Sequence, residues 1–198
     1  MALSKIQSES INLADTFAFT GTVTGAGSNI KERLAMLCDG EDYTVSSGTY
    51  TSTNVTAAAG TSSTFSTLGG SAITYTPPSG TTGVLYEFIY QQSSLSAQHS
   101  ILSARLVIAG TEVTDSRTDI GANSNMSNLI SFRYLIPIGG TGSAATGRQA
   151  TWTSGKELKI ECRRHSASNE PRLHVTYYYD GSISAQFHRP SLIITSFG

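Results

Sequence analysis

Hydrophobic and polar residues alternate along much of this chain with a period of two, which is typical of strands half-buried in a sheet. The clearest stretch spans residues 71–90. Ile73 and Tyr75 alternate there with small polar residues, and the segment Pro77-Pro78-Ser79-Gly80 must then turn, because proline fixes φ and lacks an N–H. The denser apolar run at 84–90 predicts a central strand that is buried on both faces.

Further strands follow from the same alternation. We expect residues 101–108 and 111–113 to form a hairpin through Ala109-Gly110, because glycine adopts the left-handed backbone that a tight turn needs. For the same reason, residues 63–68 are expected to pair with 73–76 across Gly69-Gly70. The other expected strands are 41–45, 49–56, 129–138, 156–164, 172–179 and 191–197, with polar loops at 91–99, 117–127 and 141–149. The alternation places Ile130, Phe132, Tyr134 and Ile136 on one face of 129–138, and Leu158, Ile160 and Cys162 on the inward face of 156–164. Many short strands separated by turns predict an all-β fold, a sandwich or jelly roll.

Residues 29–40 fit two structures. Asn29 followed by Glu32 is a capping-box pattern that would begin a helix. Read as a strand, the segment places Leu34, Met36 and Cys38 on one face. We favour a strand at 34–38, with room for one helical turn before it.

Residues 1–27 differ from the rest of the chain and predict an arm that precedes a domain at 28–198. Residues 16–24 alternate as a strand would, but a single strand cannot bury its phenylalanines and must dock on something. A flexible joint is expected at 25–28. The alternative is an edge strand of the same domain. The candidate anchoring residues of the arm are Ile11, Leu13, Phe17, Phe19 and Val23.

Composition excludes several function classes. Charged residues make up only 14% of the chain and the net charge is −1, so we expect no nucleic-acid partner. We expect no signal peptide, because residues 1–10 contain no apolar h-region. We also expect no membrane insertion, because no segment approaches the roughly 18 apolar residues of a membrane span. Cys38 and Cys162 lack metal-ligand spacing and are expected to be free buried thiols, with one disulfide as the alternative.

The sequence shows no arrangement typical of catalysis. Residues 142–149 have the glycine spacing of a phosphate-binding loop, but Arg148 and Gln149 stand where lysine and serine or threonine are needed. Of the four histidines, only His174 and His188 could meet across strands. No carboxylate pair and no nucleophile elbow is visible. We therefore expect no catalytic, cofactor or metal site, and hence no enzyme.

The segment Tyr177-Tyr178-Tyr179 is the strongest aromatic cluster in the sequence. Tyrosine offers a large ring and a hydroxyl at low entropic cost, which suits recognition of sugars or proteins. The alternative is packing in the core or in a subunit interface. These three residues are the candidate receptor or trimer-interface residues.

Several motifs carry a resemblance to a protein family. The sequence T-Y-T-P-P-S-G-T-T followed by V-L-Y-E-F resembles the jelly-roll knobs of virion-surface proteins, such as tail fibres and appendages, of marine tailed phages. L-V-I-A-G-T-E-V at 106–113, F-R-Y-L-I-P-I-G-G at 132–140, T-G-R-Q-A-T-W at 146–152, residues 172–181 and the N-terminal segment extend it over most of the chain. Those knobs are similar in shape to the trimeric TNF/C1q-like jelly rolls.

The resemblance implies a homotrimeric knob in the virion, assembled in the cytoplasm of a bacterial host. It also implies that the arm binds other virion proteins, of tail or capsid, while the knob contacts a glycan or protein on the host surface. A head fibre or capsid decoration protein is the alternative within the virion. A carbohydrate-binding module is an alternative of another class.

Overall fold

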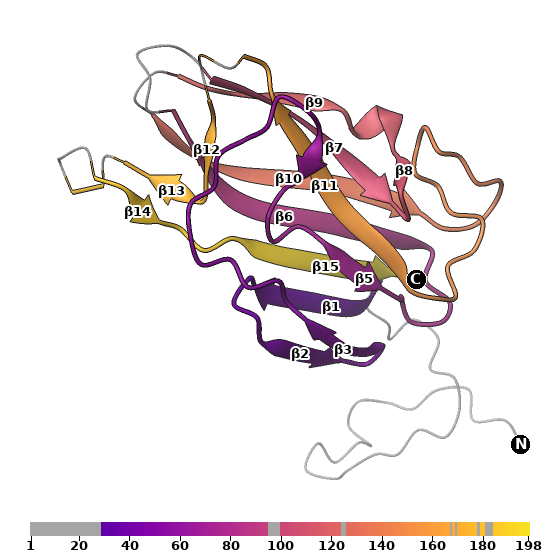
Figure 1. Cartoon of the computed structure of the whole chain (residues 1–198). Helices are drawn as coiled ribbons and strands as arrows, with labels where there is room; N and C mark the ends of the chain where they lie inside the picture. The colour runs from indigo at the N-terminus through magenta and orange to yellow at the C-terminus, as the bar shows by residue number, and fades with distance from the viewer. Residues whose placement is uncertain are drawn as a thin grey trace, which may run out of the picture.

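The alternating segments form two antiparallel sheets stacked as a β-sandwich, so the predicted all-β class is confirmed (Figure 1). The structure is a computed structural model and describes residues 29–94, 100–123, 126–166, 168, 170–177, 179–180 and 184–198. The predicted arm lies outside these residues. Both the division at residue 27 and the jelly-roll assignment stay predictions.

The first sheet has the order β1-β15-β6-β10, all antiparallel. Its strands are β1 (Ile30–Leu37), β15 (Ser191–Phe197), β6 (Gly83–Ser93) and β10 (Ser127–Pro137). Strand β12 (Arg172–Leu173) pairs with β6 beyond the end of β15. The centre of this sheet is therefore β6, the strand predicted to be central.

The second sheet is built around β11 (Lys156–Arg164) and β7 (Ser100–Ile108). On its far side, β7 pairs with β8 (Thr111–Glu112) and β9 (Thr118–Ala122), and a 3₁₀ helix (Thr114–Ser116) lies between those two strands in the chain. On the other edge of β11 lie β4 (Ser66–Thr67) and β5 (Ile73–Tyr75).

Two small hairpins complete the described strands. One is formed by β2 (Asp42–Val45) and β3 (Gly48–Thr51), and it lies beside β1 at the bottom of Figure 1. The other is formed by β13 (Val175–Thr176) and β14 (Gln186–Phe187), which project at one end of the sandwich.

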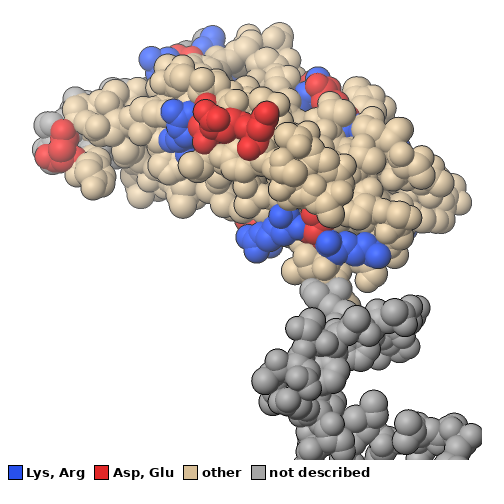
Figure 2. Space-filling model, turned by 90° about the horizontal axis from the view of Figure 1, so that it is seen from below, with Lys and Arg blue, Asp and Glu red and all other residues tan. Residues whose placement is uncertain are grey.

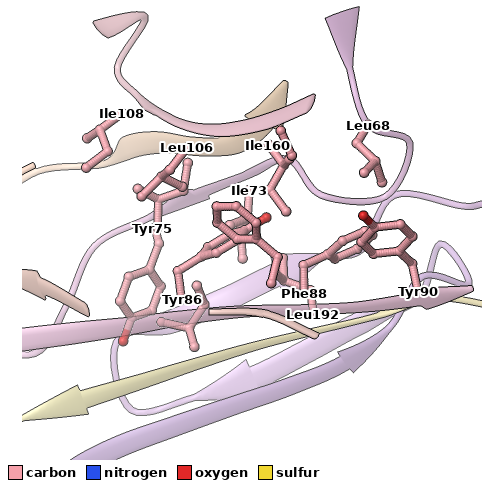
Figure 3. Close-up of a cluster of buried hydrophobic side chains, with 14 of the residues drawn as sticks. Leu68, Ile73, Tyr75, Tyr86, Phe88, Tyr90, Leu106, Ile108, Ile160 and Leu192 are labelled. Atoms are coloured by element: carbon pink, nitrogen blue, oxygen red, sulfur yellow. The ribbon is translucent and has the colours of Figure 1, made fainter. Parts of the chain in front are cut away.

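The core lies between the two sheets, where each strand contributes every second side chain. Aromatic rings from β6 of the first sheet and β5 of the second sheet fill its centre, where they lie among aliphatic side chains such as Leu106 and Ile160 (Figure 3). Phe88 shares a rung with Phe132 of β10 and Leu192 of β15, and its ring stacks on Tyr90 with 5.6 Å between centroids. The largest fully buried side chains include Tyr75, Tyr86, Phe88, Tyr90, Leu34, Leu68, Leu102, Leu106, Ile136, Leu158, Ile160 and Leu192.

Three strand predictions are confirmed in detail. Leu34, Met36 and Cys38 are buried on one face, and the inward residues of β10 and β11 are those expected. The β7–β8 hairpin turns through Ala109 at φ 47° and Gly110 at φ 79°. Cys38 and Cys162 are both free and buried.

Two predictions about strands are wrong, one of pairing and one of extent. β4 and β5 do not pair with each other but follow one another along the edge of β11. Ser71 explains this arrangement, because its hydroxyl donates to the carbonyl of Leu68 (2.7 Å) and accepts from the N–H of Ile160 (3.1 Å). The side chain thus bridges the gap between the two strands. The expected strand at 172–179 is also interrupted, because buried His174 adopts φ 61°.

Three further expectations need correction. β1 begins at Ile30, so residues 30–33 are part of the strand and do not form a helical turn. β9 lies inside a segment expected to be a loop. β6 is fully buried on one face only, since Leu85 and Ile89 on its outer face are only partly covered. No second layer of the described chain packs on that side, which makes this face the starting point for function.

Candidate subunit interface and surface sites

The outer face of the first sheet is apolar and open. The pairing register places its outward side chains in rungs, such as Leu135 of β10 beside Leu85 of β6. Leu129 is 63% exposed, Leu135 55% and Leu37 51%. We call this surface the apolar face and define it by Ile30, Ala35, Leu37, Leu85, Ile89, Leu129, Leu135, Ile193 and Phe197.

The polar groups at the centre of the apolar face partly neutralise one another. Arg133 lies 3.5 Å from the carboxylate of Glu87, which also accepts a hydrogen bond of 2.8 Å from Ser131. Four strands about 4.8 Å apart, with about eight residues at about 3.3 Å each, give the sheet an outer area of roughly 500 Å². Arg33 on β1 also points out of this face, so the exposed apolar area is smaller than the sheet area. Contiguous apolar patches of a few hundred Å² are often interaction surfaces.

The outer face of the second sheet has the opposite character. Arg105 binds Glu112 at 2.7 Å and Glu161 at 2.8 Å, and Arg117 binds Glu112 at 2.6 Å. The hydrogen bond from Arg117 holds the pKa of Glu112 below its ordinary value. Lys159 pairs with Glu157 at 3.0 Å. Burying such a face in an interface would require desolvating several charges at once, which is costly.

Charged side chains are clustered on the side of the molecule that is seen from below (Figure 2). Figure 2, which views the molecule from below, shows them in a few small groups, whereas most of the described surface in that view is uncharged. The two outer faces of the sandwich are therefore chemically distinct, and the apolar face is the one suited to contact with another protein surface.

A buried carboxylate joins the β2–β3 hairpin to the sandwich. Glu32 is only 7% exposed and accepts hydrogen bonds from the Ser46 hydroxyl (2.5 Å), the Ser47 N–H (2.7 Å), the Ser47 hydroxyl (2.6 Å) and the Tyr75 hydroxyl (2.7 Å). Burial raises its pKa, but the hydrogen bonds from Ser46, Ser47 and Tyr75 outweigh burial, so the pKa is lowered. These hydrogen bonds connect β1, β5 and the turn between β2 and β3, so the role of the network is structural.

The predicted tyrosine cluster is divided by the structure. Tyr177 is 8% exposed, Tyr179 is 84% exposed, and Tyr178 lies outside the described residues. Strand β13 ends at Thr176, so the strand alternation expected through Tyr179 does not hold. Tyr179 alone of the two described tyrosines is available for a surface contact. The predicted anchoring residues Ile11, Leu13, Phe17, Phe19 and Val23 also lie outside the described part of the chain.

The two cysteines and His174 are buried. Burial raises the pKa of both Cys38 and Cys162 to about 12, so neither thiol is ionised near neutral pH. His174 and His188 are neighbours, with the N–H of His188 donating to the carbonyl of His174 at 2.9 Å. Within the described ranges, no group of three or more His, Cys, Asp or Glu side chains is placed to hold a metal ion. In the same ranges no helix is long and apolar enough to cross a membrane.

Comparison with known proteins gives only distant likenesses. No family model and no curated protein matches the sequence. The solved structures that match include those of the infectious bursal disease virus Gx strain and Gt strain, each with a TM-score of 0.37 and 12% identity. The matches cover 92% and 93% of this chain but only 42% and 43% of those chains, so it spans less than half their length. At a TM-score this low, the likeness establishes neither a shared fold nor a function.

The residues of the apolar face were missed at the sequence level. Leu129 and Leu135 alternate with the inward residues of β10 and so had to point outward, but alternation alone does not say what covers an outward side chain. The signal that could have identified this face was the nearly continuous run of apolar residues in β6, where Leu85 and Ile89 lie between the buried aromatic residues.

Proposed function

We propose that this chain is a non-enzymatic structural protein of a tailed-phage virion, in which the β-sandwich associates as a homotrimeric knob. The observation that supports self-association is the contrast between the two outer faces, one apolar and one occupied by ion pairs. The sequence motifs given above support the virion setting. On this proposal the apolar face packs against neighbouring protomers and the charged face stays in solvent.

The size of the apolar face is compatible with a stable assembly. Each partner in a standard interface contributes about 800 Å². The sheet itself supplies roughly 500 Å². The loops at its ends and the β2–β3 hairpin beside β1 can supply the rest. In a closed trimeric ring every protomer contacts two others and there are three equivalent interfaces. The free energy gained by burying one outward leucine is therefore gained three times per trimer.

The arm at residues 1–27 is proposed to attach the knob to other virion proteins. The outward surfaces, among them Tyr179 at 84% exposure, then contact the host. The alternative role within the virion is a head fibre or capsid decoration protein. It uses the same arm and the same trimer but places them on the capsid.

Immunogold electron microscopy of intact particles, with antibody against residues 28–198, tests the virion role. Label at the tail supports adsorption to the host. Label spread over the head supports the decoration role instead, and particles without label overturn the virion proposal. Sedimentation of the purified protein tests the trimer independently, since a folded monomer at micromolar concentration contradicts it.

A further inference from the structure

The charged outer face contains a hollow of about 400 Å³ over strands β7, β9 and β11. Its lining includes Phe65, Ser103, Arg105, Arg117, Asp119 and Arg163. A hollow of this size lies within the usual range for small-ligand sites. It opens on the side of the sandwich opposite the apolar face, so association through that face leaves it accessible.

One wall of the hollow is held rigidly. Arg105 is fixed between Glu112 and Glu161, and its Cζ lies 3.9 Å from the centroid of the Phe65 ring. The Cζ of Arg163 lies over the same ring at 5.1 Å. Phe65 therefore orients the Arg163 guanidinium by a cation–π contact without using any of its N–H donors.

The groups across the hollow are not paired with one another. Arg163 on β11, Ser103 on β7 and Asp119 on β9 share one rung of the sheet. Two strand spacings, or about 10 Å, separate the backbones of Arg163 and Asp119, and their side chains form no ion pair with each other. Within the described part of the chain neither of them forms a salt bridge, although other charged groups on this face do.

We propose that this hollow binds a carboxylated saccharide. The planar fork of Arg163 suits a carboxylate, which it can bind through two N–H groups. Asp119 can accept hydrogen bonds from sugar hydroxyls, and Ser103 can donate hydrogen bonds to them or accept hydrogen bonds from them. A cation and a carboxylate set apart on either side of a hydroxyl match a ligand that carries both carboxylate and hydroxyl groups. A simple anion would leave Asp119 repelling it.

This inference rests on the proposed attachment function, because it names the ligand class that the outward face would take from a host surface. Its test needs only the purified protein. Failure of that test therefore removes the ligand class and leaves the virion role to be judged by the location of the gold label.

Isothermal titration calorimetry with trigalacturonate, and with a neutral galactose trisaccharide as the matched probe, measures the interaction. We expect the acidic trisaccharide to bind at least tenfold more tightly than the neutral one. Arg163→Gln should weaken acidic binding at least tenfold, and Asp119→Asn should weaken both probes. Lys159→Gln is the control, because Lys159 lies on the same strand and face but outside the hollow, and it should change binding less than twofold.

Several results would overturn the proposal. They are the absence of binding by the wild-type protein at millimolar trigalacturonate, equal binding of the neutral probe, and an equal loss in the Lys159 control, which would reduce the effect to overall charge. Binding of inorganic phosphate as tight as that of trigalacturonate in the same calorimetric titration would also overturn it, because the site would then bind any anion. Unchanged thermal unfolding of each variant establishes that the fold is intact.

Discussion

Replacing Leu135 by serine tests the role of the apolar face most directly. Leu135 lies on β10 and is 55% exposed in the isolated chain, so its side chain contributes little to the core. Substitution at such a position should change the stability of a protomer by only about 0.5 kcal/mol. If the face is a subunit interface, however, the same leucine becomes buried and its loss must weaken association.

The expected weakening follows from the exposed fraction. Full burial of a leucine side chain contributes about 1.5–3 kcal/mol, so burying the 55% that is exposed contributes about 0.8–1.7 kcal/mol per protomer. Three copies give about 2.5–5 kcal/mol per trimer. Since the midpoint concentration of a monomer–trimer equilibrium varies as the square root of its dissociation constant, the midpoint should rise about 8- to 70-fold.

Sedimentation-velocity ultracentrifugation over a dilution series measures that midpoint. Ile101→Ser is the matched control, because Ile101 is also exposed, at 37%, but lies on the other sheet. The control should sediment like the wild-type protein at every concentration. The reasoning is refuted if Leu135→Ser dissociates no earlier than the wild type, or if the Ile101 control dissociates equally early.

Three further predictions concern the fold. Glu32→Gln should cost about 1.5–3 kcal/mol in urea unfolding at pH 7, because charge-assisted hydrogen bonds are lost. The pKa of Glu32 is lowered in the folded protein, so its contribution is present above the unfolded pKa and is lost as the pH falls through the folded pKa. A cost that does not shrink on acidification below that range would contradict the assignment. Burial lowers the pKa of His174 from 6.5 to about 4, against a smaller opposing effect of the Gly69 backbone. The unfolded chain therefore binds the proton first, and the free energy of unfolding should fall by about 3 kcal/mol as the pH is lowered from 6.5 to 4. His174→Asn, which tolerates the left-handed backbone, should abolish this pH dependence; if it persists, another group causes it. Gly70→Ala should destabilise the fold by about 2 kcal/mol or more in thermal unfolding, because φ is +86° and the new Cβ would lie 2.9 Å from the sulfur of Cys38. Gly121→Ala is the control and should be near neutral, because no atom lies within 4 Å of the new Cβ. Similar melting temperatures for the two variants would refute this prediction.

Local patterns predicted most of the strands because alternation reflects which side of a strand faces the core. The inward residues of β10 and β11 and the Ala109-Gly110 turn depend on neighbours in the chain, so the sequence was sufficient for them. β9 was missed because residues 118–122 contain glycine and aspartate and become a strand only through pairing with β7.

By itself, the sequence determined the all-β class, the central position of β6, the β7–β8 hairpin and the inward faces of β10 and β11. Tertiary structure decided that the two cysteines are free and which distant strands pair, as with β4 and β5 along β11. It also decided which outward side chains stay uncovered, and it brought Arg163, Ser103 and Asp119 onto one rung from three separate segments. The physical reason is that burial and pairing are properties of contacts between distant segments, and a period of two along one strand does not specify what lies across from it.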